Sequence, residues 1–461
     1  MPRGASGATS RDARFVGGLR LFDVGTRRGL ATAVPCGGYE VNTRPGRLHG
    51  DLAARGRNMN DDRSRACRPP RAEKYGQEPA SNSSGSRRSH VVDWAWEPVS
   101  EEAISDLSSR LEHSRDAVLS SADAWSRGVP ADFLQTLLRH WSRAFDWRVP
   151  EQRIRSYPWV RTHIDGVPVT AIHQRATDPD APVVVLLHGW PDSFLRFERV
   201  LPLLTDVHAV IPCLMGFPGA VGVSDRVATP QLMADQVAAL MNALGYDRYV
   251  VSGGDVGSVV ATHLATNHGD AVAALHLTDL PAIRVPEAIR ESLTESEQKY
   301  YRDARRWRSA EGGYLVEQAT KPHTLAHALA DSPAGLAAWI IEKLHGWSDH
   351  NGDVESAFTR DDLLTWVSLY WHTRAIGTSF DPYSALPLDV PFIKTPTAVS
   401  MFSHGLLPPE RSLFAKFYNV RSWALHDSGG HFAAWEKPAE FLSGLHAAVG
   451  FVSPTVCSDV T

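Results

Sequence analysis

The stretch VSGGDVGS, residues 251–258, decides the fold class of this 461-residue chain. It ends the apolar run DRYVVSGG and opens the helix-like run VGSVVATHLATNHG. Asp255 therefore stands between an expected strand and an expected helix, flanked by Gly253 and Gly257. Glycines permit the cramped turn known as a nucleophile elbow, which pushes the central side chain outward. The structural alternative is that Asp255 only caps the helix.

Strands and helices alternate on both sides of this turn. The runs APVVVLLHGWPDS, HAVIPCLMGFPGA and VAALHLTDLP read as buried strands, and a helix is expected from Pro230 to Gly245. The last strands are expected in TPTAVSMFSHG and VRSWALHDSGGHF, with a closing helix in EKPAEFLSGLHAAVGFV. This alternation predicts an α/β fold with a mostly parallel sheet.

The same pass along the chain divides it into segments. An N-terminal segment contains a helix capped by Ser100 and a hairpin whose turn is Asp165-Gly166. Residues between the expected core strands break the alternation, are mostly helical, and are expected to cover the edge of the sheet where ligands bind. The expected divisions are a basic tail (1–90), the N-terminal segment (91–175), a first core part (176–282), a helical cap (283–385) and a second core part (386–452).

Charge is unevenly divided along the chain. Residues 1–90 carry 17 Lys/Arg and 8 Asp/Glu, whereas the whole chain has a net charge of −5. This first stretch is rich in Arg, Gly and Ser and is expected to be disordered. A basic tail can contact nucleic acid, but we favour a solvated tail, or a start codon placed too early with Met59 as the internal start. No nucleic-acid partner is predicted.

Composition excludes several classes of protein. Hydrophobic residues make up 43% of the chain, but no apolar run approaches the ~20 residues of a membrane span. Four cysteines are scattered without a disulfide framework, which predicts a reducing, cytoplasmic location. Neither Cys nor His shows the spacing of a zinc site, so no metal and no cofactor are expected.

Two further motifs accompany the expected elbow. The motif HGWP, residues 188–191, follows an earlier strand and places the Trp190 backbone N–H as one oxyanion donor, with Val256 N–H as the other. The motif GGHF, residues 429–432, places His431 after the last strand, where a general base is needed. Any single histidine is more often a packing or surface residue. Three motifs in the order of a hydrolase make chance agreement improbable.

On these motifs, residues 92–450 resemble the α/β-hydrolase-fold epoxide hydrolases of the microsomal type. The resemblance is carried by HGWPDSF, YDRYVVSGGDVGS, EQATKPHTLAHALADSPAGLAAWIIEKLHGWSD and GGHFAAWEKP. It implies a helical cap and an N-terminal segment that wraps the core, and it includes no counterpart of the family's membrane anchor. It also suggests homodimers and a role in detoxification or aromatic hydrocarbon catabolism.

The resemblance implies a two-step mechanism. Asp255 would attack an epoxide carbon to form an ester, and His431 would activate the water that cleaves it. Two cap tyrosines, which match Tyr314 and Tyr383, would donate to the ring oxygen. A phenol remains protonated at neutral pH and donates a strong hydrogen bond. Each tyrosine is otherwise a packing residue.

The chain departs from the family pattern in the triad acid. Where the family has a Phe-Pro-x-acid run, MFSHGLL has Ser403 in place of the proline and Gly405 in place of the acid. We interpret Asp279, at the end of a strand, as the replacement, because related dehalogenases place their acid there. A loop Asp before Pro281 is the alternative for Asp279, and Asp427 is a weaker candidate.

Three functions remain open on the sequence. The leading one is hydrolysis of a hydrophobic epoxide to a vicinal diol, because the cap is rich in aromatic residues. A haloalkane dehalogenase also uses an Asp nucleophile, but it commonly has a halide-binding Trp where this chain has Val256. The absent acid at Gly405 favours a third function, a binding protein for hydrophobic ligands. The aromatic residues of the cap include Trp307, Trp339, Trp347, Trp366 and Trp371. The alternative is that most of these tryptophans are core residues.

Overall fold

The computed structural model describes residues 90–119, 125–220 and 226–452 of the chain. The expected disorder of residues 1–89 lies outside these ranges. In the described part, no helix is long and apolar enough to cross a membrane. The same part contains no group of three or more His, Cys, Asp or Glu side chains that could hold a metal ion.

A nine-stranded sheet forms the centre of the described structure, in the order β1-β2-β3-β5-β4-β6-β7-β8-β9. The first three pairs in this order are antiparallel, and the remaining five are parallel. The predicted mostly parallel α/β sheet is therefore confirmed. The strands are β1 (Val92–Asp93), β2 (Trp159–Ile164), β3 (Val167–Gln174), β4 (Val183–Leu187), β5 (His208–Pro212), β6 (Tyr249–Gly253), β7 (Val272–Leu277), β8 (Ile393–His404) and β9 (Tyr418–Gly430).

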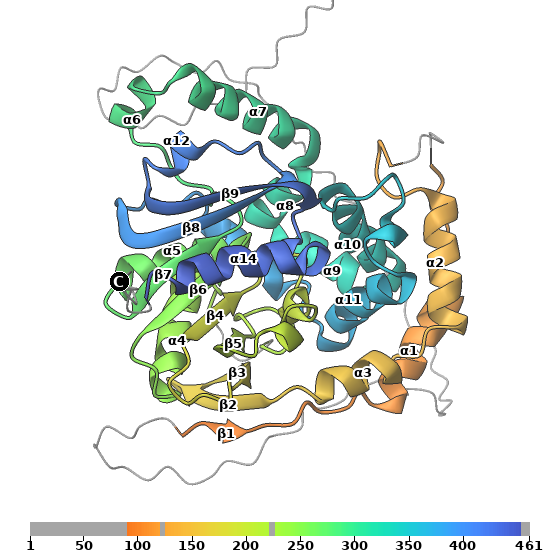
Figure 1. Ribbon diagram of the computed structural model, residues 1–461. Helices are drawn as coiled ribbons and strands as arrows, with labels where there is room; N and C mark the ends of the chain where they lie inside the picture. Colours follow the sequence, from red (N-terminus) through yellow and green to blue (C-terminus); the bar gives the residue numbers. More distant parts are fainter. Residues whose placement is uncertain (1–89, 120–124, 221–225, 453–461) are drawn as a thin grey trace, which may run out of the picture. The chain divides into compact units, whose positions relative to one another are not determined.

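Helices join the core strands as the pattern of the sequence predicts. Thr229 caps α4 and Pro230 opens it, while Gly245 follows its end with φ +86°. The closing helix crosses in front of the strands in Figure 1 and packs on β7 and β8. The helical elements of the core are η1 (Phe194–Phe197), η2 (Leu201–Leu203), α4 (Pro230–Ala243), α5 (Val256–Asn267), α12 (Arg411–Phe414), α13 (Ala433–Glu436) and α14 (Pro438–Val449).

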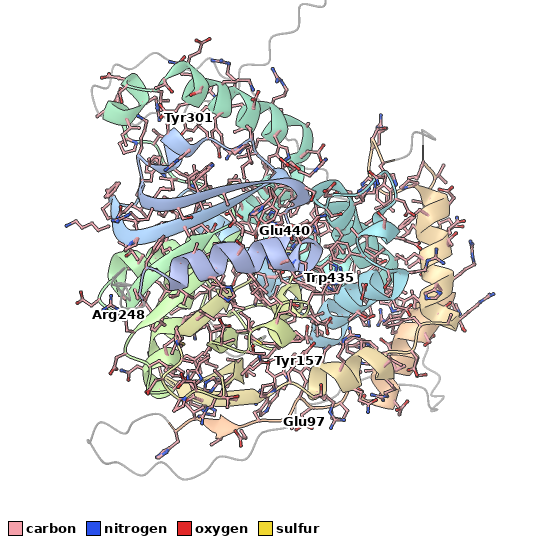
Figure 2. The ribbon with its side chains drawn as sticks, in the orientation of Figure 1. Glu97, Tyr157, Arg248, Tyr301, Trp435 and Glu440 are labelled. Atoms are coloured by element: carbon pink, nitrogen blue, oxygen red, sulfur yellow. The ribbon has the colours of Figure 1, made fainter. Side chains whose placement is uncertain are left out.

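A mostly helical stretch lies between β7 and β8, as expected. Capping boxes at Thr294 and Thr359 begin two of its helices. Trp435, labelled in Figure 2, stacks on Phe358 at a ring distance of 5.4 Å and so joins this stretch to the core. Its elements are α6 (Glu287–Glu291), α7 (Glu295–Glu311), α8 (Gly313–Thr320), α9 (Pro322–Asp331), α10 (Pro333–Trp347), η3 (Val354–Ser356), α11 (Arg360–Thr373) and η4 (Thr378–Ala385).

The N-terminal segment packs against the core and the cap through α1 (Glu101–Glu112), α2 (Ala131–Arg143) and α3 (Arg148–Arg155). The Ser100 side chain accepts the Ala103 N–H, as predicted for a cap. Asp165 and Gly166 both have positive φ in the turn between β2 and β3, as predicted for that hairpin. Tyr157, also labelled in Figure 2, donates a hydrogen bond to Glu198 of the core. The division into domains stays a prediction.

Candidate active site

The backbone of Asp255 has the strained turn expected of an elbow. Its φ and ψ are 55° and −129°, and it lies between β6 and α5. Its side chain lacks the hydrogen bond of an N-cap residue, which would come from the second or third residue of the helix. A Cβ added to Gly257 would lie 2.1 Å from the Leu187 carbonyl oxygen, and one added to Gly253 would lie 2.3 Å from the Gly257 oxygen. Only glycine at these positions lets α5 lie against β4 with Asp255 projecting between them.

Backbone N–H groups meet the Asp255 carboxylate where the sequence places them. Trp190 N–H donates to Oδ1 over 2.8 Å, and Val256 N–H also donates to the carboxylate. Burial alone would raise the pKa of Asp255, but His431 and these two N–H groups hold it below its ordinary value. Asp255 is therefore ionised at neutral pH, as a nucleophile must be. A Cβ on Gly189 would lie 2.4 Å from Oδ1, so glycine is needed there too.

His431 lies beside the other carboxylate oxygen. Its Nε2 is 3.5 Å from Asp255 Oδ2. The backbone N–H of His431 donates to the Trp347 carbonyl oxygen over 2.8 Å, and the His431 carbonyl oxygen accepts from Arg196 Nη2 over 2.6 Å. Arg196 also forms a buried ion pair with Asp192. These two hydrogen bonds hold the His431 backbone between the cap and the core, with the imidazole directed toward Asp255.

Two charged residues that support this loop were not found from the sequence. Glu436 accepts N–H groups from Gly430 over 3.0 Å and from Phe432 over 2.9 Å, on either side of His431. Burial raises the pKa of Glu436, although these N–H groups act against the shift. Arg196 is the second. Arg196 in PDSFLRF and Glu436 in HFAAWEKP are charged residues next to apolar neighbours, and this pattern is the signal that could have revealed them.

The two predicted tyrosines meet above Asp255. Tyr314 of α8 and Tyr383 of η4 have ring centroids 5.9 Å apart in a perpendicular arrangement, and Tyr314 stacks parallel to Trp190 at 5.4 Å. Burial and the Asp255 charge raise the pKa of both phenols above the ordinary value. Within the described part of the chain, the buried Tyr383 hydroxyl has no hydrogen-bond partner. An unpaired buried hydroxyl is costly, so this group is suited to an incoming acceptor.

Asp279 lies on the other side of the elbow. Its Oδ2 accepts the Asp255 backbone N–H over 2.5 Å. Burial raises its pKa, while the nearby His431 charge lowers it. Among the described residues, no hydrogen bond joins the Asp279 carboxylate to the His431 imidazole. The structure thus brings Asp279 to the site through Asp255, and its role as triad acid stays a prediction.

Asp427 and Gly405, the other positions considered for the acid, give a clear contrast. Asp427 is exposed on β9 and does not line the cavity, so the structure does not bring this candidate to the site. Gly405 does line the cavity, and it has no side chain to offer. Asp279 is the predicted candidate that lies close to both Asp255 and His431.

A cavity of ≈ 150 Å³ connects these groups. Asp255, Asp279, Tyr314, Tyr383 and His431 all line it, at the carboxyl ends of the core strands and beneath the cap. The rest of the wall is mainly apolar, with Leu280, Pro281, Leu315, Leu386, Met401, Phe402 and Phe414. None of the five cap tryptophans lines this cavity, which agrees with the alternative that most of them are packing residues. Trp347, for example, packs edge-on against Tyr314 and His431.

Comparison with known proteins agrees with this geometry. Residues 97–197 match the family model described as epoxide hydrolase N terminus, and residues 182–318 match that of the alpha/beta hydrolase fold. A relative from Stigmatella aurantiaca, named "Putative epoxide hydrolase", is 35% identical over 371 residues. These residues cover 75% of this chain and 82% of the relative. The chain belongs to the epoxide hydrolase family. This confirms the resemblance and the predicted fold class.

Two further epoxide hydrolases extend over most of the chain. Epoxide hydrolase 1 of Sus scrofa is 28% identical over 420 residues, covering 80% of this chain and 91% of its own length. The solved structure of Aspergillus niger epoxide hydrolase has a TM-score of 0.70 and 31% identity, covering 79% of this chain and 97% of its own. Membership in this family supports epoxide hydrolysis as the activity.

Proposed function

We propose that this epoxide hydrolase converts hydrophobic epoxides to vicinal diols through an ester on Asp255. The observation that carries the proposal is the position of Asp255 between two sets of groups. Its Oδ1 accepts the Trp190 N–H, and its Oδ2 lies 3.5 Å from His431 Nε2. The two tyrosines of the cap line the same cavity. Nucleophile, base and proton donors therefore share one small apolar space.

Ring opening is the first step. Asp255 Oδ2 forms a bond to one epoxide carbon, and the electron pair of the breaking C–O bond passes to the ring oxygen. Tyr314 and Tyr383 donate hydrogen bonds to that oxygen, and one of the two phenols transfers its proton to it. The oxygen becomes a hydroxyl and that tyrosine becomes a tyrosinate. Both phenols keep their protons at neutral pH, because burial and the Asp255 charge raise their pKa. The product of this step is a hydroxyalkyl ester of Asp255.

Ester hydrolysis is the second step. His431 Nε2 takes a proton from water as the water oxygen attacks the Asp255 carbonyl carbon. The resulting oxyanion is stabilised by the N–H groups of Trp190 and Val256. Collapse breaks the bond between the carbonyl carbon and the alkyl oxygen, which leaves with the proton held by His431. Asp255 is left as a carboxylic acid, and its proton passes to the tyrosinate, so that both groups return to their starting states. We propose that Asp279 stabilises the imidazolium that forms in between.

The use of Asp follows from the chemistry of the substrate. A serine would give an ether with an epoxide, and water does not readily cleave an ether. An aspartate gives an ester, which the oxyanion groups and His431 can hydrolyse. The mainly apolar wall of the cavity favours a hydrophobic epoxide, such as one formed by oxidation of an aromatic hydrocarbon.

Trapping the ester tests this proposal. In His431→Asn the first step should proceed and the second should stop, so brief exposure to styrene oxide should add one substrate mass to a peptide that contains Asp255. Wild-type protein should show the adduct only transiently and release the diol. Asp255→Asn is the control and should form no adduct. If His431→Asn forms no adduct and the wild-type protein forms neither an adduct nor the diol, the proposal is wrong.

The same experiment separates this activity from dehalogenation. A haloalkane dehalogenase would release bromide from 1-bromobutane and leave styrene oxide unchanged. Val256 occupies the position beside the nucleophile where such enzymes commonly have a halide-binding Trp, so we expect no bromide release. Bromide release without diol formation would favour the dehalogenase.

A further inference from the structure

A buried lysine lies against Tyr314, and the mechanism above does not use it. Lys343 belongs to α10, and its side chain is only 6% exposed. Its Nζ lies 4.8 Å from the centroid of the Tyr314 ring and 5.8 Å from that of Trp347. It also forms an ion pair with Glu342. A buried ammonium group is costly unless other groups compensate for its lost hydration.

Tyr314 lies between two hollows that contain opposite charges. Tyr314 lines both the catalytic cavity and a second hollow of ≈ 740 Å³ between α10 and the N-terminal segment. Asp255 lines only the first and Lys343 only the second. The phenol thus lies between the nucleophile's anion and a cation on its ring. The anion disfavours loss of the phenol proton, whereas a cation over an aromatic ring favours the growth of negative charge there.

From this arrangement we infer that Lys343 is a positioning residue that strengthens Tyr314 as the hydrogen-bond donor during ring opening. The inference rests on the proposed function, because it concerns the proposed first step. As the epoxide C–O bond breaks, the phenol O–H gives part of its proton to the ring oxygen and the aromatic ring gains negative charge. A cation fixed on the ring stabilises that charge more than it stabilises the neutral phenol.

A purely structural role for Lys343 would have a different kinetic signature. Lys343 also contacts the Trp347 ring, and the Trp347 oxygen holds the His431 N–H at 2.8 Å. Loss of packing at Lys343 would therefore disturb His431 and slow ester hydrolysis. Loss of the cation on Tyr314 would slow ring opening only. The two half-reactions thus distinguish the two roles.

The test is single-turnover kinetics with styrene oxide, in which ester formation and ester hydrolysis are measured separately by rapid quenching and mass spectrometry. In Lys343→Met, ester formation should slow roughly tenfold or more, which corresponds to ~1.4 kcal/mol of transition-state stabilisation. The rate of ester hydrolysis should remain within about twofold of the wild-type rate, a difference of under ~0.5 kcal/mol. Lys343→Arg should recover most of the lost rate, because it keeps the cation. Lys321→Met, at an exposed position after α8, is the matched control and should leave both rates unchanged.

A double-mutant cycle completes the test. In a Tyr314→Phe background the hydroxyl is gone, so Lys343→Met should cause no further loss in ester formation. If Lys343→Met does not fold, Lys343→Gln carries the same expectations. Three outcomes would each overturn the inference. Lys343→Met could form the ester at the wild-type rate, both steps could slow equally, or the losses from Lys343→Met and Tyr314→Phe could add. Absence of any ester in the wild-type protein would instead contradict the proposed function.

Discussion

At the scale of single residues, the two oxygens of Asp255 have different surroundings. Oδ1 accepts the Trp190 N–H, in the place where an oxyanion would later form, whereas Oδ2 faces His431. The carboxylate is therefore held with one oxygen directed to the oxyanion donors and the other available for attack. Asp279 reinforces this orientation by accepting the Asp255 backbone N–H. The Asp279 carboxylate thus holds the backbone of Asp255 and lines the same cavity as His431.

Asp279→Asn tests whether this residue is the triad acid. The amide oxygen can still accept the Asp255 N–H, so the elbow should keep its shape while the negative charge is lost. Turnover should fall by roughly 10²–10⁴-fold, the usual contribution of acid–base assistance, and the Asp255 ester should accumulate. Steady-state diol formation and intact-protein mass spectrometry measure the two effects. Asp427→Asn, exposed on β9, is the control; unchanged turnover in Asp279→Asn would exclude the acid role.

At the scale of elements, the site depends on how closely α5 approaches β4. The helix begins directly after Asp255, and a Cβ at Gly257 would meet the Leu187 and His188 carbonyl oxygens at 2.1 Å and 2.8 Å. Both of those oxygens belong to backbone that leads into the HGWP loop. The same contact therefore positions the elbow and the Trp190 N–H. A displacement of α5 would move the nucleophile away from its oxyanion donor.

Gly257→Ala should consequently damage both stability and activity. Because the added methyl group would overlap two backbone carbonyl oxygens, we expect a loss of at least about 3 kcal/mol in the free energy of unfolding. Chemical denaturation followed by far-UV circular dichroism measures this loss. Gly346→Ala is a suitable control, since Gly346 is helical with open space around its Cβ and should gain up to about 1 kcal/mol. Equal stability in the two variants would contradict the close approach.

At the scale of the whole molecule, neutral histidines buried in the core tie the sheet together. His276 of β7 forms hydrogen bonds with Ser252 of β6 over 2.9 Å and with Ser400 of β8 over 3.0 Å. Burial lowers the pKa of His276 to about 3 and that of His188 to about 4. Both groups remain uncharged in the folded chain at pH values where an unfolded histidine is protonated.

Stability should therefore decrease as the solution is acidified. Since the folded-state pKa lies below the unfolded value of about 6.5, protons bind preferentially to the unfolded chain below that pH. Each buried histidine should contribute a slope of up to about 1.4 kcal/mol per pH unit between about pH 6 and its folded pKa. His276→Asn should reduce this slope in denaturation curves recorded from pH 7 to pH 5. His163→Asn, exposed on β2, is the control, and an unchanged slope in His276→Asn would contradict the assignment.

Local sequence predicted the elbow, the hairpin turn and the caps because each depends on residues that are neighbours in the chain. Asp255 between glycines, Asp165-Gly166 and Ser100 require specific backbone angles or hydrogen bonds that few other residues satisfy. The order of the motifs and the resemblance that they carry also identified the tyrosines and His431 as candidates. The structure places Tyr314, Tyr383 and His431 at one cavity with Asp255. Homodimers stay a prediction.

What only the tertiary structure decided is which distant groups surround those candidates. Composition left open whether the five cap tryptophans line the pocket or belong to the core. Packing directs them away from the cavity, and smaller apolar residues from several elements form its wall. Lys343, Glu436 and Arg196 could be assigned no role from the sequence, because the role of a buried charge depends on the partners that fold around it. The sequence by itself therefore determined the fold class and the elbow at Asp255, the proposed nucleophile, since these follow from local pattern and motif order. Tertiary structure determined the electrostatic surroundings, since burial and charge proximity depend on residues that are far apart along the chain.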